Sequence, residues 1–136
     1  MSAFSNIPPQ AVLPLGAYDL DELTKSARWA DQRLLQVDLA GVGDKAQLMD
    51  AIARGFSLPK HFGRNLDALY DCITDLQPLP EAEQPGFVVI LQNLPDGPRF
   101  DVEQRDALLD VFRDAADFYF DRKTAFRVFY SVAGKA

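Results

Sequence analysis

Apolar residues recur every three to four positions in three segments, and this spacing predicts three amphipathic helices. Asp44 is suited to cap the first of these helices, which extends to about Phe56. Asn65 is suited to cap the second, which ends near Leu76, and the third spans Asp101–Phe120. Each predicted helix has one apolar side, so we expect all three to cover a common core.

Three short apolar runs between and after these helices predict β-strands: Arg33–Leu39, Phe87–Leu91 and Thr124–Val132. The middle run (FVVIL) is apolar at every position, which is typical of a strand that is covered on both faces. Helices separate the strands and no hairpin turn joins them. The pattern therefore predicts a single α/β domain with a three-stranded parallel sheet flanked by helices.

The beginning of the chain has a different character. Ser5–Gly16 is rich in proline and apolar residues without a period, which predicts an extended arm. Asp19 can then cap a short helix that ends near Ala30. We expect residues 1–30 to form this arm and helix, and residues 31–136 to form the main domain.

The charge balance limits the classes of partner. The chain has 136 residues, of which 20 are acidic and 14 are basic, for a formal net charge of −6. This balance argues against direct binding of nucleic acid, which requires basic residues, and suits a basic partner. A single cysteine, Cys72, allows no internal disulfide. The chain shows no export signal and no apolar run that could span a membrane, so we expect a cytoplasmic protein.

Two of the predicted helices carry acidic side chains opposite their apolar sides. Asp67 and Asp71 stand four residues apart in the second helix. In the third helix the acidic side consists of Glu103, Asp106, Asp110, Asp114 and Asp117, with Arg113 the nearby cation. Like charges four residues apart destabilise a helix by about 0.2–0.5 kcal/mol. By itself, such a run of charges is more often an ordinary solvent-facing surface than a binding surface.

Catalysis is poorly supported by the residues. Cys72 lies at the apolar margin of its helix, where a small buried thiol is typical, and His61 lies in a loop without a third group to orient it. Asp67 and Asp71 share one helix, whereas metal ligands come from several elements. We therefore expect no enzyme activity, no catalytic residues, no metal and no cofactor, while a hydrolase that uses the aspartates remains an alternative.

The segment 61–75 (HFGRNLDALYDCITD) resembles the signature segment of the barstar family, whose members inhibit microbial ribonucleases. Weaker similarity extends from Leu34 to Val132, with a longer linker at Gln77–Gly86. The resemblance implies a three-stranded parallel sheet flanked by helices, in agreement with the pattern above. It identifies residues 31–136 as a barstar-like domain.

The resemblance also implies a binding site, because in that family the loop and the second helix plug the nuclease active site. Asp67 and Asp71 match the central acidic contacts. Asp114 matches a contact on the third helix, with a side chain one methylene shorter than the usual glutamate. The remaining positions implied as partner-binding are His61, Gly63, Asn65, Tyr70 and Thr74. His61 and Tyr70 replace the common tyrosine and tryptophan, and Arg64 adds a positive charge at the rim.

The expectation is therefore a cytoplasmic, bacterial-type ribonuclease inhibitor, similar to the antitoxin of a toxin–antitoxin pair. It would be a monomer when free and would bind a basic nuclease one to one. A protein-interaction module on the same fold, with a partner that is not a nuclease, is the alternative.

Overall fold

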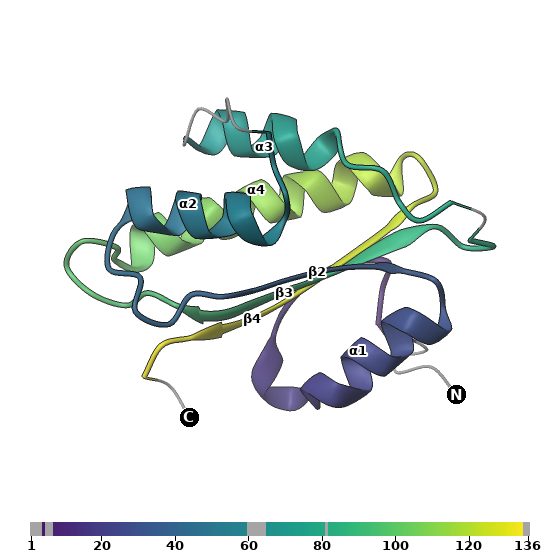
Figure 1. The fold of residues 1–136 in the computed structure, drawn as a ribbon, viewed down its shortest axis with the longest axis horizontal. Coiled ribbons are helices and arrows are strands. Elements are labelled where there is room, and N and C mark those ends of the chain that lie inside the picture. Colours follow the sequence, from purple (N-terminus) through teal and green to yellow (C-terminus); the bar gives the residue numbers. More distant parts are fainter. Residues whose placement is uncertain (1–3, 5–6, 60–64, 81, 135–136) are drawn as a thin grey trace.

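The computed structural model describes residues 4, 7–59, 65–80 and 82–134, which form layers of helices on both faces of one sheet (Figure 1). Among the described residues, three helices cover one face of the sheet and one helix covers the other. In chain order the elements are β1 (Gln10–Pro14), a 3-10 turn (Leu15–Ala17), α1 (Leu20–Trp29), β2 (Arg33–Asp38), α2 (Lys45–Gly55), α3 (Leu66–Thr74), β3 (Gly86–Leu94), α4 (Val102–Phe120) and β4 (Ala125–Val132). The predicted α/β class with helices flanking a parallel sheet is confirmed.

The sheet has four strands in the order β1-β4-β3-β2, and all neighbours are parallel. The predicted number of three strands is therefore wrong. The additional strand comes from the segment that we expected to be an extended arm, and it pairs along β4 with Val12 opposite Val128. Prolines around this segment hide its strand character in the sequence. At the edge of a sheet, however, a proline such as Pro14 at the end of β1 is tolerated.

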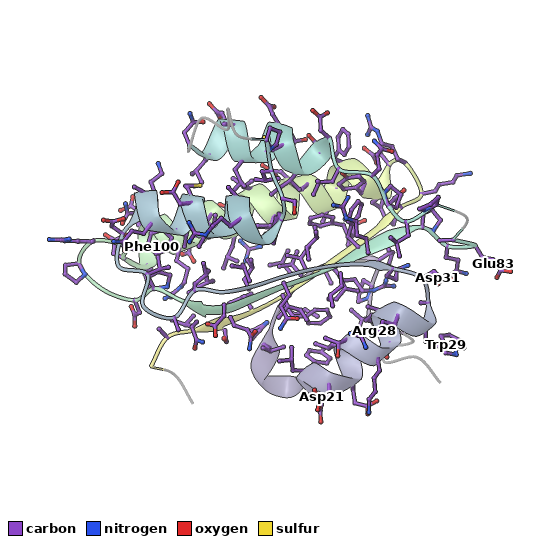
Figure 2. The ribbon with its side chains drawn as sticks, in the orientation of Figure 1. Asp21, Arg28, Trp29, Asp31, Glu83 and Phe100 are labelled. Carbon is purple, nitrogen blue, oxygen red and sulfur yellow. The ribbon has the colours of Figure 1, made fainter. Side chains whose placement is uncertain are left out.

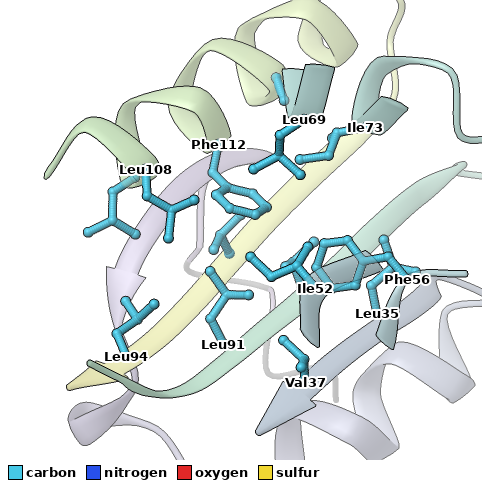
Figure 3. Close-up of a cluster of buried hydrophobic side chains, with 14 of the residues drawn as sticks. Leu35, Val37, Ile52, Phe56, Leu69, Ile73, Leu91, Leu94, Leu108 and Phe112 are labelled. Atoms are coloured by element: carbon cyan, nitrogen blue, oxygen red, sulfur yellow. The ribbon is translucent and has the colours of Figure 1, made fainter. Parts of the chain in front are cut away.

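The main core lies between the sheet and the layer formed by α2, α3 and α4 (Figure 3). Leu69 and Ile73 of α3, Phe112 of α4 and Phe56 at the end of α2 are buried there. The rings of Phe56 and Phe112 meet edge to face, with their centroids 6.3 Å apart. Burial of these apolar side chains fixes which side of each helix faces solvent.

A second core covers the other face of the sheet. Leu23 and Ala27 of α1 pack there against Val88 and Ile90 of β3 and Phe129 of β4. Strand β3 is therefore buried on both faces, as its continuous apolar run predicted. In contrast, the last residue of α1, Trp29, extends away from the body of the molecule with 75% of its surface exposed (Figure 2).

Helix α3 lies outermost and is attached to α4 (Figure 1). The hydroxyl of Tyr119 on α4 lies 2.7 Å from the carbonyl oxygen of Ile73 and 2.8 Å from that of Leu76, at the carboxyl end of α3. This contact adds a side-chain donor at the carboxyl end of α3, where the carbonyls of a helix have few partners within the helix. It also holds α3 alongside α4, which creates the groove described below.

In the part of the chain that the structure describes, no helix combines the length and the apolarity needed to cross a bilayer.

Candidate functional site

A groove of about 620 Å³ lies between α3 and α4, and aspartates dominate its walls. We call it the acidic groove. Its lining residues are Leu66, Asp67, Tyr70, Asp71, Val111, Asp114, Asp117, Phe118, Asp121 and Arg122. The floor is thus partly apolar and aromatic, while the rim carries five carboxylates and one guanidinium.

Local sequence explains how α3 presents its carboxylates. The side chain of Asn65 accepts a hydrogen bond from the backbone N–H of Ala68 at 2.8 Å, which caps the helix as predicted. Because Leu69 is buried against the core, Asp67 and Asp71 point to solvent one turn apart. Asp67 lies in the first turn, where the helix dipole favours an anion.

Helix α4 forms the other wall. Its start is fixed by a capping box, in which Asp101 and Gln104 each accept a hydrogen bond from the other's backbone N–H. With Phe112 buried below, Asp114 and Asp117 are exposed toward the groove, three residues apart. Two separately capped helices therefore hold the carboxylates at fixed spacings.

Among the described residues, none of the carboxylates of the groove forms an ion pair. Ion pairs between described residues involve Arg105 with Asp96 and Arg113 with Asp110, and none of these residues lines the groove. Asp117 accepts a hydrogen bond from the side-chain amide of Gln10 at 2.7 Å, which is a neutral partner. The groove therefore keeps its negative charge and can attract a basic group.

The structure brings four of the sequence-predicted site residues together, because Asp67, Tyr70, Asp71 and Asp114 all line the groove. Thr74 does not line it, since its hydroxyl donates to the carbonyl of Tyr70 within α3 at 2.8 Å. Asn65 acts as the helix cap described above. The expectations for His61 and Gly63, and for the neighbouring Arg64, lie outside the described residues.

Six residues of the groove were not among the predicted contacts: Leu66 and Val111, and then Asp117, Phe118, Asp121 and Arg122. Counted from Asp114, the last four follow at three, four, seven and eight residues, which is the spacing of one helical stripe. Continuing the acidic face of the predicted helix by one more turn would have found them.

Cys72 is half-buried on α3 and is a poor candidate for a nucleophile. Burial raises the pKa of its thiol, and the nearby charges of Asp75 and Asp71 raise it further. This setting disfavours the thiolate, which is the reactive form. Among the described residues, no three His, Cys, Asp or Glu side chains are arranged to hold a metal ion.

These observations define a class of protein: a small α/β domain with a parallel sheet and an anionic binding groove between two helices. Residues 32–131 match the family model described as "Barstar (barnase inhibitor)". The chain therefore belongs to the barstar family, and the resemblance stated from the sequence is confirmed. The family is one of inhibitors, which agrees with the expectation of a protein without enzyme activity. A search of curated proteins found no match.

The matched range contains β2, β3, all of β4 except its last residue, and the three helices that build the main core and the acidic groove. Strand β1 and helix α1 precede it, although they pack on the same sheet.

Proposed function

We propose that this protein inhibits a ribonuclease by placing the acidic groove against the basic active site of the enzyme. The observation that carries the proposal is the convergence of Asp67, Asp71 and Asp114 on one groove from two capped helices. Membership of a family described as barnase inhibitors supports a nuclease as the partner. The partner-binding set would consist of these three aspartates with Tyr70, Asn65, Thr74, Gly63 and His61.

The chemistry of a ribonuclease explains why such a groove can block it. The enzyme gathers cationic side chains around the phosphate of its substrate. Carboxylates held at fixed spacings on rigid helices offer the same charge as the phosphates and can occupy the same place. Complementary charge of this kind also accelerates association, and the effect weakens as salt screens it.

The remaining expectations form part of the same proposal. One groove on one face implies a complex of one inhibitor with one nuclease, and a monomer before binding. An inhibitor of this kind protects RNA in the compartment where the chain is made, which points to the bacterial cytoplasm and to an antitoxin-like role.

Inhibition of barnase, the nuclease in the family description, provides the test. RNA cleavage is measured against increasing inhibitor, and affinity is measured at low and high salt. Asp71→Ala should weaken binding by about 2–5 kcal/mol, the general cost of removing one partner of a buried charge pair. Asp106→Ala is the matched control, because Asp106 is exposed on α4 but does not line the groove.

Equal inhibition by the parent chain and Asp71→Ala would exclude the acidic groove as the interface. If barnase itself is not bound, affinity capture from a bacterial lysate at low salt extends the test to other basic ribonucleases. Failure to retain any ribonuclease would refute the proposal.

A protein partner other than a nuclease is the second candidate, and Arg122 is the observation that favours it. This guanidinium places a positive charge in the groove, where a wholly basic partner would be repelled. Recovery of a non-nuclease protein whose binding depends on Asp71 would support this candidate.

A further inference from the structure

One end of the acidic groove combines a cation with an aromatic ring. The Cζ atom of Arg122 lies 3.6 Å from the centroid of the Phe118 ring, within the range of a cation–π contact. Its Nη1 atom donates a hydrogen bond to the carbonyl oxygen of Phe118 at 2.9 Å. Both contacts join Arg122, two residues beyond the end of α4, to Phe118 in its last turn, and they hold the guanidinium in one orientation.

This arrangement fixes Arg122 without neutralising its charge. None of the ion pairs between described residues includes Arg122, although Asp121 and four other aspartates line the same groove. Of the described residues that form the groove, Arg122 is also the only cation. A partner seated in the groove therefore meets negative charge along the rim and one positive charge at the end.

The stabilising role of a cation at a helix carboxyl terminus gives a purely structural explanation for Arg122. That role does not require a place on the groove wall. Arg113 provides the comparison, because it lies within α4 and is paired with Asp110 at 2.7 Å, away from the groove.

We propose that Arg122 is a selectivity residue of the acidic groove, which favours a basic protein segment that carries an acidic side chain opposite Arg122. A wholly basic segment meets repulsion at that point, whereas a carboxylate on the partner forms an ion pair there. The half-buried Phe118 ring excludes water from one side of the guanidinium, which strengthens such a pair. This inference rests on the proposed function only in assuming that the groove binds a basic protein.

Two peptide probes test this inference without a nuclease. One is a hexa-arginine peptide, and the other has the same sequence with one central arginine replaced by glutamate. Their affinities for the full chain are measured at low salt by NMR titration. Arg122→Gln should raise the affinity for hexa-arginine by about threefold, the scale of one partly screened charge contact. It should also reduce, by a similar factor, the ratio of the affinity for the peptide with glutamate to the affinity for hexa-arginine.

Two further variants separate the groove charge from other effects. Arg113→Gln removes one positive charge from α4 outside the groove. It should change neither the affinity for hexa-arginine nor the preference for the peptide with glutamate. Arg122→Lys keeps the charge but loses the planar stack, so it should retain the preference of the parent chain. Thermal melting of each variant verifies that the fold survives.

The inference is overturned if Arg122→Gln behaves like the parent chain or like Arg113→Gln, or if Arg122→Lys loses the preference in full. Binding of the peptides without inhibition of any ribonuclease contradicts the proposed function alone. Binding of neither peptide to the parent chain contradicts this inference as well.

Discussion

Replacement of Tyr119 by phenylalanine tests the contact that holds the two walls of the groove together. The hydroxyl of Tyr119 reaches the carbonyl oxygens of Ile73 at 2.7 Å and Leu76 at 2.8 Å. Ile73 is fully buried, and its carbonyl oxygen also accepts from the backbone N–H of Leu76 at 3.2 Å. The variant removes one oxygen and changes nothing else in the side chain.

The magnitude follows from what remains after the substitution. The ring stays stacked on Phe126, with centroids 5.3 Å apart, so apolar packing is retained. The carbonyl of Ile73 keeps a hydrogen bond from the backbone N–H of Leu76 at 3.2 Å, so the loss is that of a hydrogen bond and not of an unsatisfied acceptor, about 0.5–1.5 kcal/mol. A decrease of about 1 kcal/mol in the free energy of unfolding corresponds to a decrease in Tm of about 3–5 °C for a domain of this size.

Urea unfolding at neutral pH measures the difference. Tyr18→Phe is the matched control, because the hydroxyl of Tyr18 makes no hydrogen bond with any described residue and its ring keeps its edge contact with Phe129. A difference between parent and Tyr119→Phe below about 0.5 kcal/mol, the usual range for surface substitutions, would refute this account of the contact.

The same hydroxyl predicts a dependence on alkaline pH. Burial, with a further contribution from the charge of Asp75, raises the pKa of Tyr119 from 10 to about 12. Since the folded state holds this proton more tightly than the unfolded state, the stabilisation is complete below pH 10 and is lost as the pH rises toward 12. The stability difference between the parent chain and Tyr119→Phe should therefore shrink in that window.

Three further substitutions have expected outcomes that denaturant unfolding can measure. Asp71→Asn should stabilise the unbound chain by about 0.2–0.5 kcal/mol, because it removes the like charge one turn from Asp67; destabilisation would contradict the unneutralised groove. Gly86→Ala should destabilise by about 1–3 kcal/mol, because a Cβ there would collide with the side-chain amide of Gln32; an unchanged midpoint would contradict this close approach. Phe112→Ala should cost about 3–5 kcal/mol through the cavity that it leaves in the main core; a loss below 1 kcal/mol would be inconsistent with that burial.

Local signals in the sequence predicted most elements of the fold. Asp44 and Asn65 were predicted as helix caps and are found as caps, because an N-cap bonds to backbone groups two or three residues away. The apolar run Phe87–Leu91 predicted a strand with two covered faces, since both faces require apolar residues. Such signals depend on neighbours in the chain and can therefore be read without a structure.

Strand β1 could not be predicted in the same way. It pairs with β4, so that Gln10 lies opposite Phe126 near the other end of the chain. Its side chains alternate between the two faces of the sheet, with Ala11 in one core and Val12 against the other. This alternation can be recognised only when both cores are known. Five residues beside several prolines do not specify that pairing locally.

For the candidate site, too, local features could be predicted and tertiary contacts could not. The helical wheel predicted that Asp67 and Asp71 point away from the core, and the structure places them there. It could not predict that α3 lies beside the last turns of α4, because the angle between two helices depends on tertiary packing. Arg122 lies beyond the predicted end of its helix at Phe120, and so it was not considered.

The unneutralised carboxylates give the unbound chain and the proposed complex opposite responses to salt. Repulsion among the groove aspartates raises the free energy of the unbound folded state, and screening at higher ionic strength reduces it. The free energy of unfolding of the chain should therefore rise when sodium chloride is added, while its affinity for a basic nuclease falls. Asp71→Asn should weaken both trends, since one carboxylate contributes to each. If salt changed the affinity but not the stability, the attraction would have to come from charges outside the acidic groove.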